Sequence, residues 1–230
     1  MTKDAFTSFA RTYNWAIDKW ADQSALTLAI GETGTVYYSV AVNMLGPTDS
    51  NWAVNGNIAV YNPAPVQATI NGVSDIVSGG IGATVDCGVS FPYTLAGYGT
   101  LNCTYNASLP DASFRTNTAT ATRQNYSYDY LMNPTPVGTT DISSAPANVD
   151  FSNATINEVD ECANVSDSFA GNLGMVCSSQ TFPYIRTIGP YDVCGDYTVE
   201  NTASFNTNDT GVTGSDAWTV RCHRAVPAGV

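Results

Sequence analysis

Charge is the scarcest property of this sequence. Charged residues make up 12% of its 230 residues, and acidic residues outnumber basic ones 20 to 8, for a formal net charge of −12. Nucleic-acid binding needs clustered Lys and Arg to replace the counterions of phosphates, and an anionic membrane surface attracts the same residues. We therefore expect neither nucleic acid nor an anionic membrane surface among the partners.

Long apolar runs and metal-binding motifs are missing as well. No hydrophobic stretch is long enough to cross a bilayer as a helix, which predicts no membrane insertion. There is no Cys-X-X-Cys pair, and the one histidine, His223, lies next to Cys222, so we expect no zinc, other metal or cofactor. Met1-Thr-Lys-Asp leads directly into strand-like sequence rather than a signal peptide, and we interpret Met1 as an artificial start or a fragment boundary.

Strong helix formers are also few, whereas Thr, Ser, Asn, Val, Ala, Gly and Tyr dominate. Residues 5–17 alternate as a half-buried strand does, with Phe9, Arg11, Tyr13, Trp15 and Ile17 on one face. No window shows convincing helical periodicity. The composition predicts an all-β fold.

A repeat organises the chain. Cys87-GVSFPYTLAGYGTLN-Cys103 has a second copy in Cys177-SSQTFPYIRTIGPYDV-Cys194. Val-Ser-Asp precedes each copy, ending at Asp75 and at Asp167, and Asn-Thr-Ala follows each, starting at Asn117 and at Asn201. The spacing of about 90 residues is that of one small β-sandwich and exceeds a solenoid repeat.

The repeat predicts two tandem immunoglobulin-like or prealbumin-like β-sandwich modules. We expect the first at residues 1–124 and a second, shorter one at 148–230. Residues 125–147 contain two proline-rich segments and lack clear alternation, which predicts a linker or a loop-rich entry into the second module. Residues 221–230 look frayed.

The six cysteines predict a disulfide framework formed in an oxidising compartment, hence an extracellular or cell-surface location. The repeated spacing predicts that Cys87 pairs with Cys103 and Cys177 with Cys194. Cys162 and Cys222 would then be left to pair with each other.

Three polar residues occur where apolar strands are expected. Lys19 ends an early strand, Asp75 lies inside an apolar run, and Asn117 starts the last strand of the first module. This order resembles the intramolecular isopeptide domains of Gram-positive adhesins and pilins. The resemblance implies that a buried neutral lysine attacks the asparagine carboxamide while a buried protonated acid hydrogen-bonds its carbonyl, and ammonia leaves.

The same three residues have an ordinary alternative, as a solvated strand end, a turn residue and a loop cap. The second copy keeps Asp167 and Asn201, but no lysine follows Lys19. Either these residues are structural in both copies, or the second copy receives a missing strand and its lysine from a neighbour.

Other patterns carry less information. The Asn-X-Ser/Thr triplets at Asn102, Asn106, Asn125, Asn153, Asn164 and Asn208 are expected by chance in such a composition, and no catalytic nucleophile–base pattern surrounds His223. Asp160-Glu161 and Asn208-Asp209 offer oxygen ligands without an EF-hand loop. Four tryptophans (Trp15, Trp20, Trp52 and Trp218) form either a sugar platform or core packing.

Several longer strings resemble a group of bacterial extracellular repeat proteins. They are Thr12-Tyr-Asn-Trp-Ala-Ile-Asp-Lys19, Asp49-Ser-Asn-Trp-Ala-Val54, Cys87-Gly-Val-Ser-Phe-Pro-Tyr93, Arg115-Thr-Asn-Thr-Ala-Thr-Ala-Thr122 and Tyr197-Thr-Val-Glu-Asn-Thr-Ala-Ser204. The resemblance implies a non-enzymatic structural module of a surface stalk, fibre or adhesin. Its partners would be other copies or modules of the same protein, and glycans if the chain is instead a carbohydrate-binding module.

Overall fold

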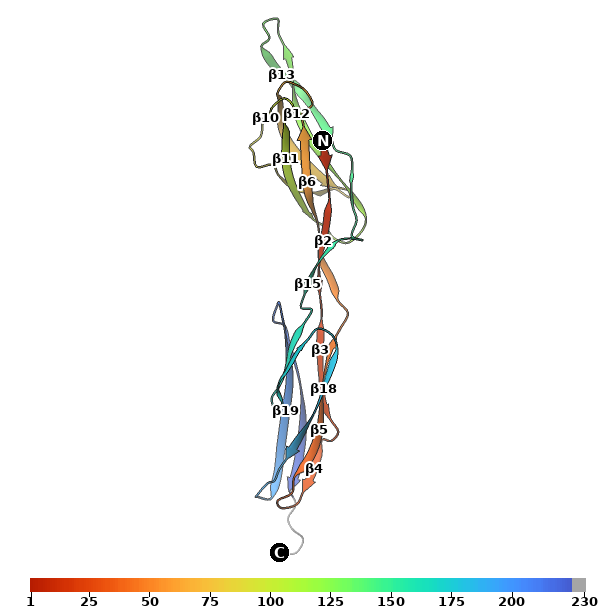
Figure 1. The fold of residues 1–230 in the computed structure, drawn as a ribbon, viewed down its shortest axis with the longest axis vertical. Helices are drawn as coiled ribbons and strands as arrows, with labels where there is room; N and C mark the ends of the chain where they lie inside the picture. The colour runs from red at the N-terminus through yellow and green to blue at the C-terminus, as the bar shows by residue number, and fades with distance from the viewer. Residues whose placement is uncertain (225–230) are drawn as a thin grey trace. The chain divides into compact units, whose positions relative to one another are not determined.

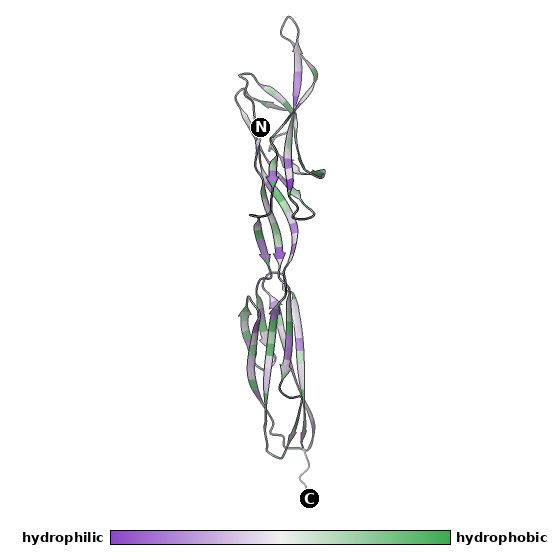
Figure 2. Cartoon of the chain, turned by 90° about the vertical axis from the view of Figure 1, so that its right-hand side faces the viewer, coloured by the Kyte–Doolittle hydropathy of each residue, from purple (hydrophilic) through white to green (hydrophobic). Residues whose placement is uncertain are grey.

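The computed structural model describes residues 1–224, which form strands and no helix (Figure 1). The all-β prediction is confirmed, and the several sheets are consistent with a β-sandwich. Residues 1–224 contain no helix that could span a membrane. Figure 2 shows hydrophobic and hydrophilic residues intermixed along the strands, as expected of strands with one buried face.

The chain divides into two compact units that are interleaved in sequence. Unit 1 comprises residues 1–10 and 49–157, and unit 2 comprises residues 11–48 and 158–230. The chain therefore passes between the units three times. This corrects the predicted boundaries at 124 and 148, because residues 11–48 pair with strands of the second unit rather than the first.

Unit 1 contains two sheets around one core. Its strands are β1 (Thr2–Lys3), β2 (Phe6–Thr12), β6 (Thr48–Tyr61), β7 (Ala68–Val77), β8 (Ile81–Gly82), β9 (Thr84–Asp86), β10 (Tyr93–Leu95), β11 (Thr100–Ser108), β12 (Arg115–Tyr128), β13 (Pro134–Ser143) and β14 (Ala147–Val149), followed by β15 (Thr155–Val159) at the unit boundary. One sheet contains the order β2-β6-β11-β9 with β1 beside β6, and the other has the order β10-β7-β12-β13. Buried Val54, Ile58, Tyr105, Val77 and Ala119 from both sheets share the core.

The predicted linker at 125–147 is largely strand. β12 continues to Tyr128 and forms a hairpin with β13. Pro134 and Pro136 fit there because β13 is the last strand of its sheet, where a missing N–H donor interrupts no further ladder. The prolines in this segment therefore belong to an edge strand of unit 1 and do not mark a linker between two modules.

Unit 2 also has two sheets. Its strands are β3 (Trp15–Ala21), β4 (Ala25–Leu28), β5 (Gly34–Met44), β16 (Ala163–Asp167), β17 (Gly171–Val176), β18 (Gln180–Ile188), β19 (Gly195–Thr207) and β20 (Thr213–Arg224). The sheet orders are β17-β16-β19-β20-β4 and β18-β5-β3. Residues 221–224, predicted to be frayed, belong to β20; residues 225–230 lie outside the described part of the chain.

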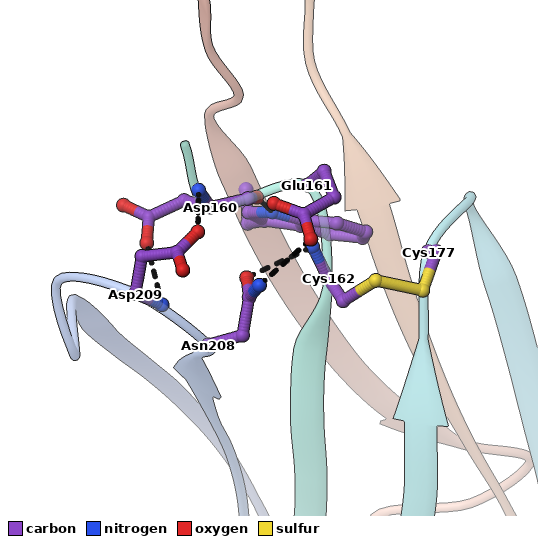
Figure 3. The surroundings of a disulfide bond; sticks show 7 residues. Asp160, Glu161, Cys162, Cys177, Asn208 and Asp209 are labelled. Carbon is purple, nitrogen blue, oxygen red and sulfur yellow. Dashed lines mark hydrogen bonds between the residues drawn. A yellow bond between two sulfur atoms is a disulfide. The ribbon is translucent and has the colours of Figure 1, made fainter. Parts of the chain in front are cut away.

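The disulfides confirm one prediction and overturn two. Cys87 is bonded to Cys103 as predicted, but Cys177 is bonded to Cys162 rather than Cys194 (Figure 3). The register of β16 and β17 sets Ala163 opposite Val176, so the flanking Cys162 and Cys177 face each other with Cα atoms 4.1 Å apart. Cys194 and Cys222 both carry thiols instead of disulfides.

Candidate functional site

The first polar cluster of the core is in unit 1 and contains Lys3. The Nζ atom of Lys3 lies 2.7 Å from Oδ2 of Asp75, and both side chains have no exposed surface. Asn117, also fully buried, donates a hydrogen bond from Nδ2 to the same Oδ2 over 3.1 Å. Lysine and asparagine, from β1 and β12, thus both contact the same buried carboxylate oxygen of β7.

Strand register places these residues together. β1 pairs with β6 so that Lys3 lies opposite Ile58, a core position. On the other sheet, Asp75 lies opposite Ala119, two residues beyond Asn117 in β12. Because side chains two apart in a strand share a face, Asn117 and Asp75 both point into the core and are diagonal neighbours.

The surroundings of Lys3 disfavour its charge. Its Nζ atom lies 3.1 Å from the centre of the Tyr105 ring, and the Tyr105 hydroxyl donates to the backbone oxygen of Asp4. Burial lowers the pKa of Lys3, and the hydrogen bond and charge of Asp75 oppose this only in part. A lowered pKa increases the neutral fraction of the amine, which is the nucleophilic form.

Two acceptor atoms in this cluster have no partner among the described residues. They are Oδ1 of Asp75 and Oδ1 of Asn117. An unpaired buried polar atom typically costs about 1–3 kcal/mol. The carboxyl of Asp75 and the amide of Asn117 each keep one acceptor atom without a donor among residues 1–224.

The second cluster is in unit 2 and contains Lys19. Its Nζ atom lies 2.5 Å from Oδ2 of Asp167, and both side chains are fully buried. The same Nζ lies 2.5 Å from the hydroxyl oxygen of Tyr184. That hydroxyl donates to Asp167 over 3.0 Å and accepts a 2.6 Å hydrogen bond from Nδ2 of Asn201.

The acid and asparagine of unit 2 have the same register as those of unit 1. Asp167 in β16 lies opposite Ala203 in β19, two residues beyond Asn201. The repeated Val-Ser-Asp and Asn-Thr-Ala sequences therefore encode the same diagonal acid–amide pair in both units. Each pair receives one of the only two lysines in the chain.

The predicted grouping of Lys19 with Asp75 and Asn117 is wrong. Asp75 and Asn117 do meet, but their lysine is Lys3, whereas Lys19 belongs to the pair in unit 2. The error follows from the chain path, since residues 11–48 leave unit 1 after the tenth residue. A count could have identified Lys3: the sequence has two acid–asparagine repeats and two lysines, which predicts one lysine for each repeat.

The pKa of Asp167 reflects two opposing effects. Burial by itself would raise the pKa. Hydrogen bonds from Lys19, from the backbone N–H groups of Ala170 and Phe169, and from Tyr184 outweigh burial, so the pKa is below its usual range. Burial, together with the neighbouring carboxylate, raises the pKa of Tyr184. Asp167 is thus held as a carboxylate beside a tyrosine that keeps its proton.

The acidic residues considered as calcium ligands form a different structure. Figure 3 shows Asp160 and Asp209 joined by reciprocal backbone–carboxylate hydrogen bonds, while Asn208 accepts from the backbone N–H of Cys162 and donates to Glu161. No group of three or more His, Cys, Asp or Glu within residues 1–224 is arranged to hold a metal. These side chains anchor the loop between β19 and β20 beside the disulfide.

The tryptophans do not form one exposed row. Trp52 stacks on Phe9 and meets the edge of Phe151, and the indole N–H groups of Trp15 and Trp218 donate to backbone oxygens. Trp20 is the most exposed, at 42%. His223, the residue considered for hydrolysis, contacts the carboxylate of Asp196 on the exposed surface.

Comparisons with protein-family models, curated proteins and solved structures find no significant match.

Proposed function

We propose that the chain is a non-enzymatic structural part of an extracellular surface stalk, fibre or adhesin, built from tandem immunoglobulin-like or prealbumin-like modules that lock themselves with internal Lys–Asn amide bonds. The observation that carries the proposal is the burial of each lysine against an aspartate, in a cluster to which a buried asparagine is hydrogen-bonded. The bonds would join Lys3 to Asn117 and Lys19 to Asn201.

Simple stabilisation explains these clusters poorly. Removing two charges from water costs several kcal/mol per ion, and apolar residues of similar volume often serve a core equally well or better. Both lysines of this chain are buried, so they do not contribute to solubility and must have another role. A covalent bond gives the buried amine a role that a hydrophobic side chain cannot fill.

The reaction balances without any added reagent. The lysine first loses a proton to the neighbouring carboxylate, and its neutral Nζ then attacks Cγ of the asparagine. A C–N bond to Nζ forms, the C–N bond to Nδ2 breaks, and Nδ2 leaves as ammonia with one further proton from Nζ. The product is a neutral secondary amide, so the buried charge of the lysine disappears.

The strand order suits a module that must resist unfolding. In unit 1 the bond would connect β1 to β12, and in unit 2 it would connect β3 to β19, so each bond closes a long stretch of chain. The two disulfides are consistent with a secreted or cell-surface protein. The partners we propose are further copies or modules of the same surface protein.

Intact-mass measurement tests the bonds. After reduction of the disulfides, the chain should be lighter than its sequence mass by about 17 Da per bond, or about 34 Da in total, because each bond releases ammonia. Trypsin should cut after neither lysine, and each should appear in a branched peptide with its asparagine. Asn117→Ala and Asn201→Ala should each abolish one loss, whereas Asn71→Ala, at an exposed asparagine, should abolish none. A wild-type chain of full mass would refute the proposal.

Carbohydrate binding is the second candidate, and a surface hollow of about 270 Å³ in unit 1 favours it. Its lining includes Tyr126, Tyr128, Arg123 and Gln124, which offer aromatic faces and hydrogen-bonding groups of the kind that hold sugars. A glycan array should then show binding that Tyr128→Ala abolishes and that Tyr98→Ala, at another exposed tyrosine, preserves. Absence of binding on the array would exclude this candidate.

A further inference from the structure

The two lysine clusters differ in how the asparagine carbonyl is held. In unit 1, Oδ1 of Asn117 has no partner among the described residues. In unit 2, the hydroxyl of Ser168 donates to Oδ1 of Asn201 over 2.8 Å. Ser168 is fixed in turn, because its Oγ accepts from the backbone N–H of Thr202 and its own N–H donates to the Thr202 oxygen.

The two acids differ as well. Oδ1 of Asp75 has no partner among residues 1–224 and leaves one edge of that carboxyl unoccupied. Oδ1 of Asp167 accepts the backbone N–H groups of Phe169 and Ala170, and its Oδ2 accepts from Lys19 and Tyr184. Every acceptor site of this carboxylate already faces a donor, so a proton taken from Lys19 stays on Oδ2, beside Lys19 and Tyr184, and is not directed at the amide oxygen. Asp167 therefore cannot polarise the Asn201 carbonyl as a protonated acid would.

We propose that Ser168 and Tyr184 are catalytic residues of the Lys19–Asn201 bond, with Ser168 stabilising the developing oxyanion on Oδ1 and Tyr184 delivering the proton to the departing Nδ2. This inference rests on the proposed function, since it assumes that the bond forms. In unit 2 two hydroxyl groups share the task that in unit 1 falls to the Asp75 carboxyl once it has taken the lysine proton.

The geometry supplies the contacts of the two hydroxyl groups and of Asp167 that the step uses. Lys19 gives one proton to Asp167, and the neutral Nζ attacks Cγ of Asn201. The negative charge that develops on Oδ1 meets the O–H of Ser168, as in an oxyanion hole. Tyr184 contacts both Nζ and Nδ2. Once Asp167 has taken the lysine proton, the Tyr184 O–H, which donates to Asp167 before the reaction, turns to Nδ2, passes its proton there and regains one from Nζ. Ammonia leaves, Asp167 ends protonated, and both hydroxyl groups are restored.

The sequence explains why only unit 2 works in this way. Ser168 directly follows the repeated Val-Ser-Asp, and Ile76 occupies the corresponding place in unit 1. Isoleucine has no donor, which agrees with the unpaired Asn117 oxygen. The repeat thus preserves the acid and the amide but changes the group that activates the carbonyl.

The test follows bond formation in the full-length chain over time. Protein is sampled after a pulse of synthesis, and peptide mapping separates the Lys19–Asn201 bond from the Lys3–Asn117 bond in the same molecules. Ser168→Ala should slow the first bond about 10²–10³-fold, the range for loss of one oxyanion donor. Tyr184→Phe should slow it by about 10²-fold or more, as for loss of a proton-transfer group. The Lys3–Asn117 bond should form at the wild-type rate in both variants.

Matched controls separate chemistry from packing. Tyr38 stacks on Tyr184, and its buried hydroxyl has no partner among the described residues, so Tyr38→Phe should leave the rate unchanged. Ser168→Thr keeps the hydroxyl and should restore most of the rate lost in Ser168→Ala. Wild-type rates in Ser168→Ala or Tyr184→Phe, or a Ser168→Thr variant as slow as Ser168→Ala, would overturn the inference while leaving the bond itself intact. A wild-type chain that never forms the Lys19–Asn201 bond would instead refute the proposed function for unit 2.

Discussion

Asn117→Ala should destabilise unit 1 strongly and leave unit 2 unchanged. The proposed bond that it removes would close a loop from Lys3 to Asn117, and in the chain-entropy model a cross-link over about 100 residues contributes roughly 5 kcal/mol. In the variant, Lys3 stays a buried amine and Asp75 stays buried without an amide partner, and an unpaired buried polar group costs about 1–3 kcal/mol. The total is comparable with the whole stability of an ordinary domain, about 5–15 kcal/mol.

Hydrogen exchange read by mass spectrometry suits this prediction, because it reports each unit separately. Peptides from β7 and β12 should exchange much faster in Asn117→Ala than in the wild type, at low concentrations of urea where peptides from β16 and β19 remain protected. Asn201→Ala should give the mirror-image result. If Asn117→Ala changes the protection of β7 and β12 by less than the worth of one hydrogen bond, about 1 kcal/mol, no covalent constraint acts in unit 1.

Two further predictions concern close packing and an acid. A Cβ atom on Gly56 would lie 2.6 Å from the backbone oxygen of Asp4 and 2.9 Å from the Tyr105 ring. Gly56→Ala should therefore lower the free energy of unfolding in urea by about 1–3 kcal/mol and slow formation of the proposed Lys3–Asn117 bond. Gly72→Ala is the control, because the space around Gly72 is open, and it should have neither effect. Burial would raise the pKa of Asp160, but hydrogen bonds led by those from Thr210 hold it below the usual range, so its contribution to stability is present above about pH 4 and is lost as pH falls through the lowered pKa. Asp160→Asn should therefore cost about 1.5–3 kcal/mol at pH 7 and clearly less at pH 2, and an equal cost at both values would contradict this account.

Local chemistry could be predicted from the sequence more completely than the path of the chain. Alternating side chains predicted the strands, and the repeated tripeptides brought Asp75 and Asn117 together correctly, because register within a pair of strands follows from side-chain periodicity. Periodicity does not say which sheet a strand joins. The passage of residues 11–48 into unit 2 therefore could not be predicted, and the lysine assignment failed with it.

The same limit explains the cysteines. The second Phe-Pro-Tyr copy lies in β18, which pairs with β5 along nine positions. The extended strand separates Cys194, which follows it, from Cys177, which precedes it. Cys162 is brought opposite Cys177 by the β16–β17 hairpin, a pairing that the repeat did not signal because the first copy has no equivalent cysteine. Similar sequence here did not mean similar pairing.

The interleaved path determines which parts of the chain would carry force. Once both amide bonds have formed, a pull on the two ends takes the shortest covalent route, which runs along the backbone from Lys3 to Lys19, crosses to Asn201 and continues through β20. The Lys19–Asn201 bond bypasses residues 20–200, which include β6 to β14 of unit 1 and form a closed loop that carries no force. The segment between the two lysines can lengthen to no more than about 60 Å at roughly 3.4 Å per residue. The protein would therefore resist stretching as a short tether, and most of unit 1 would stay folded because no tension reaches it.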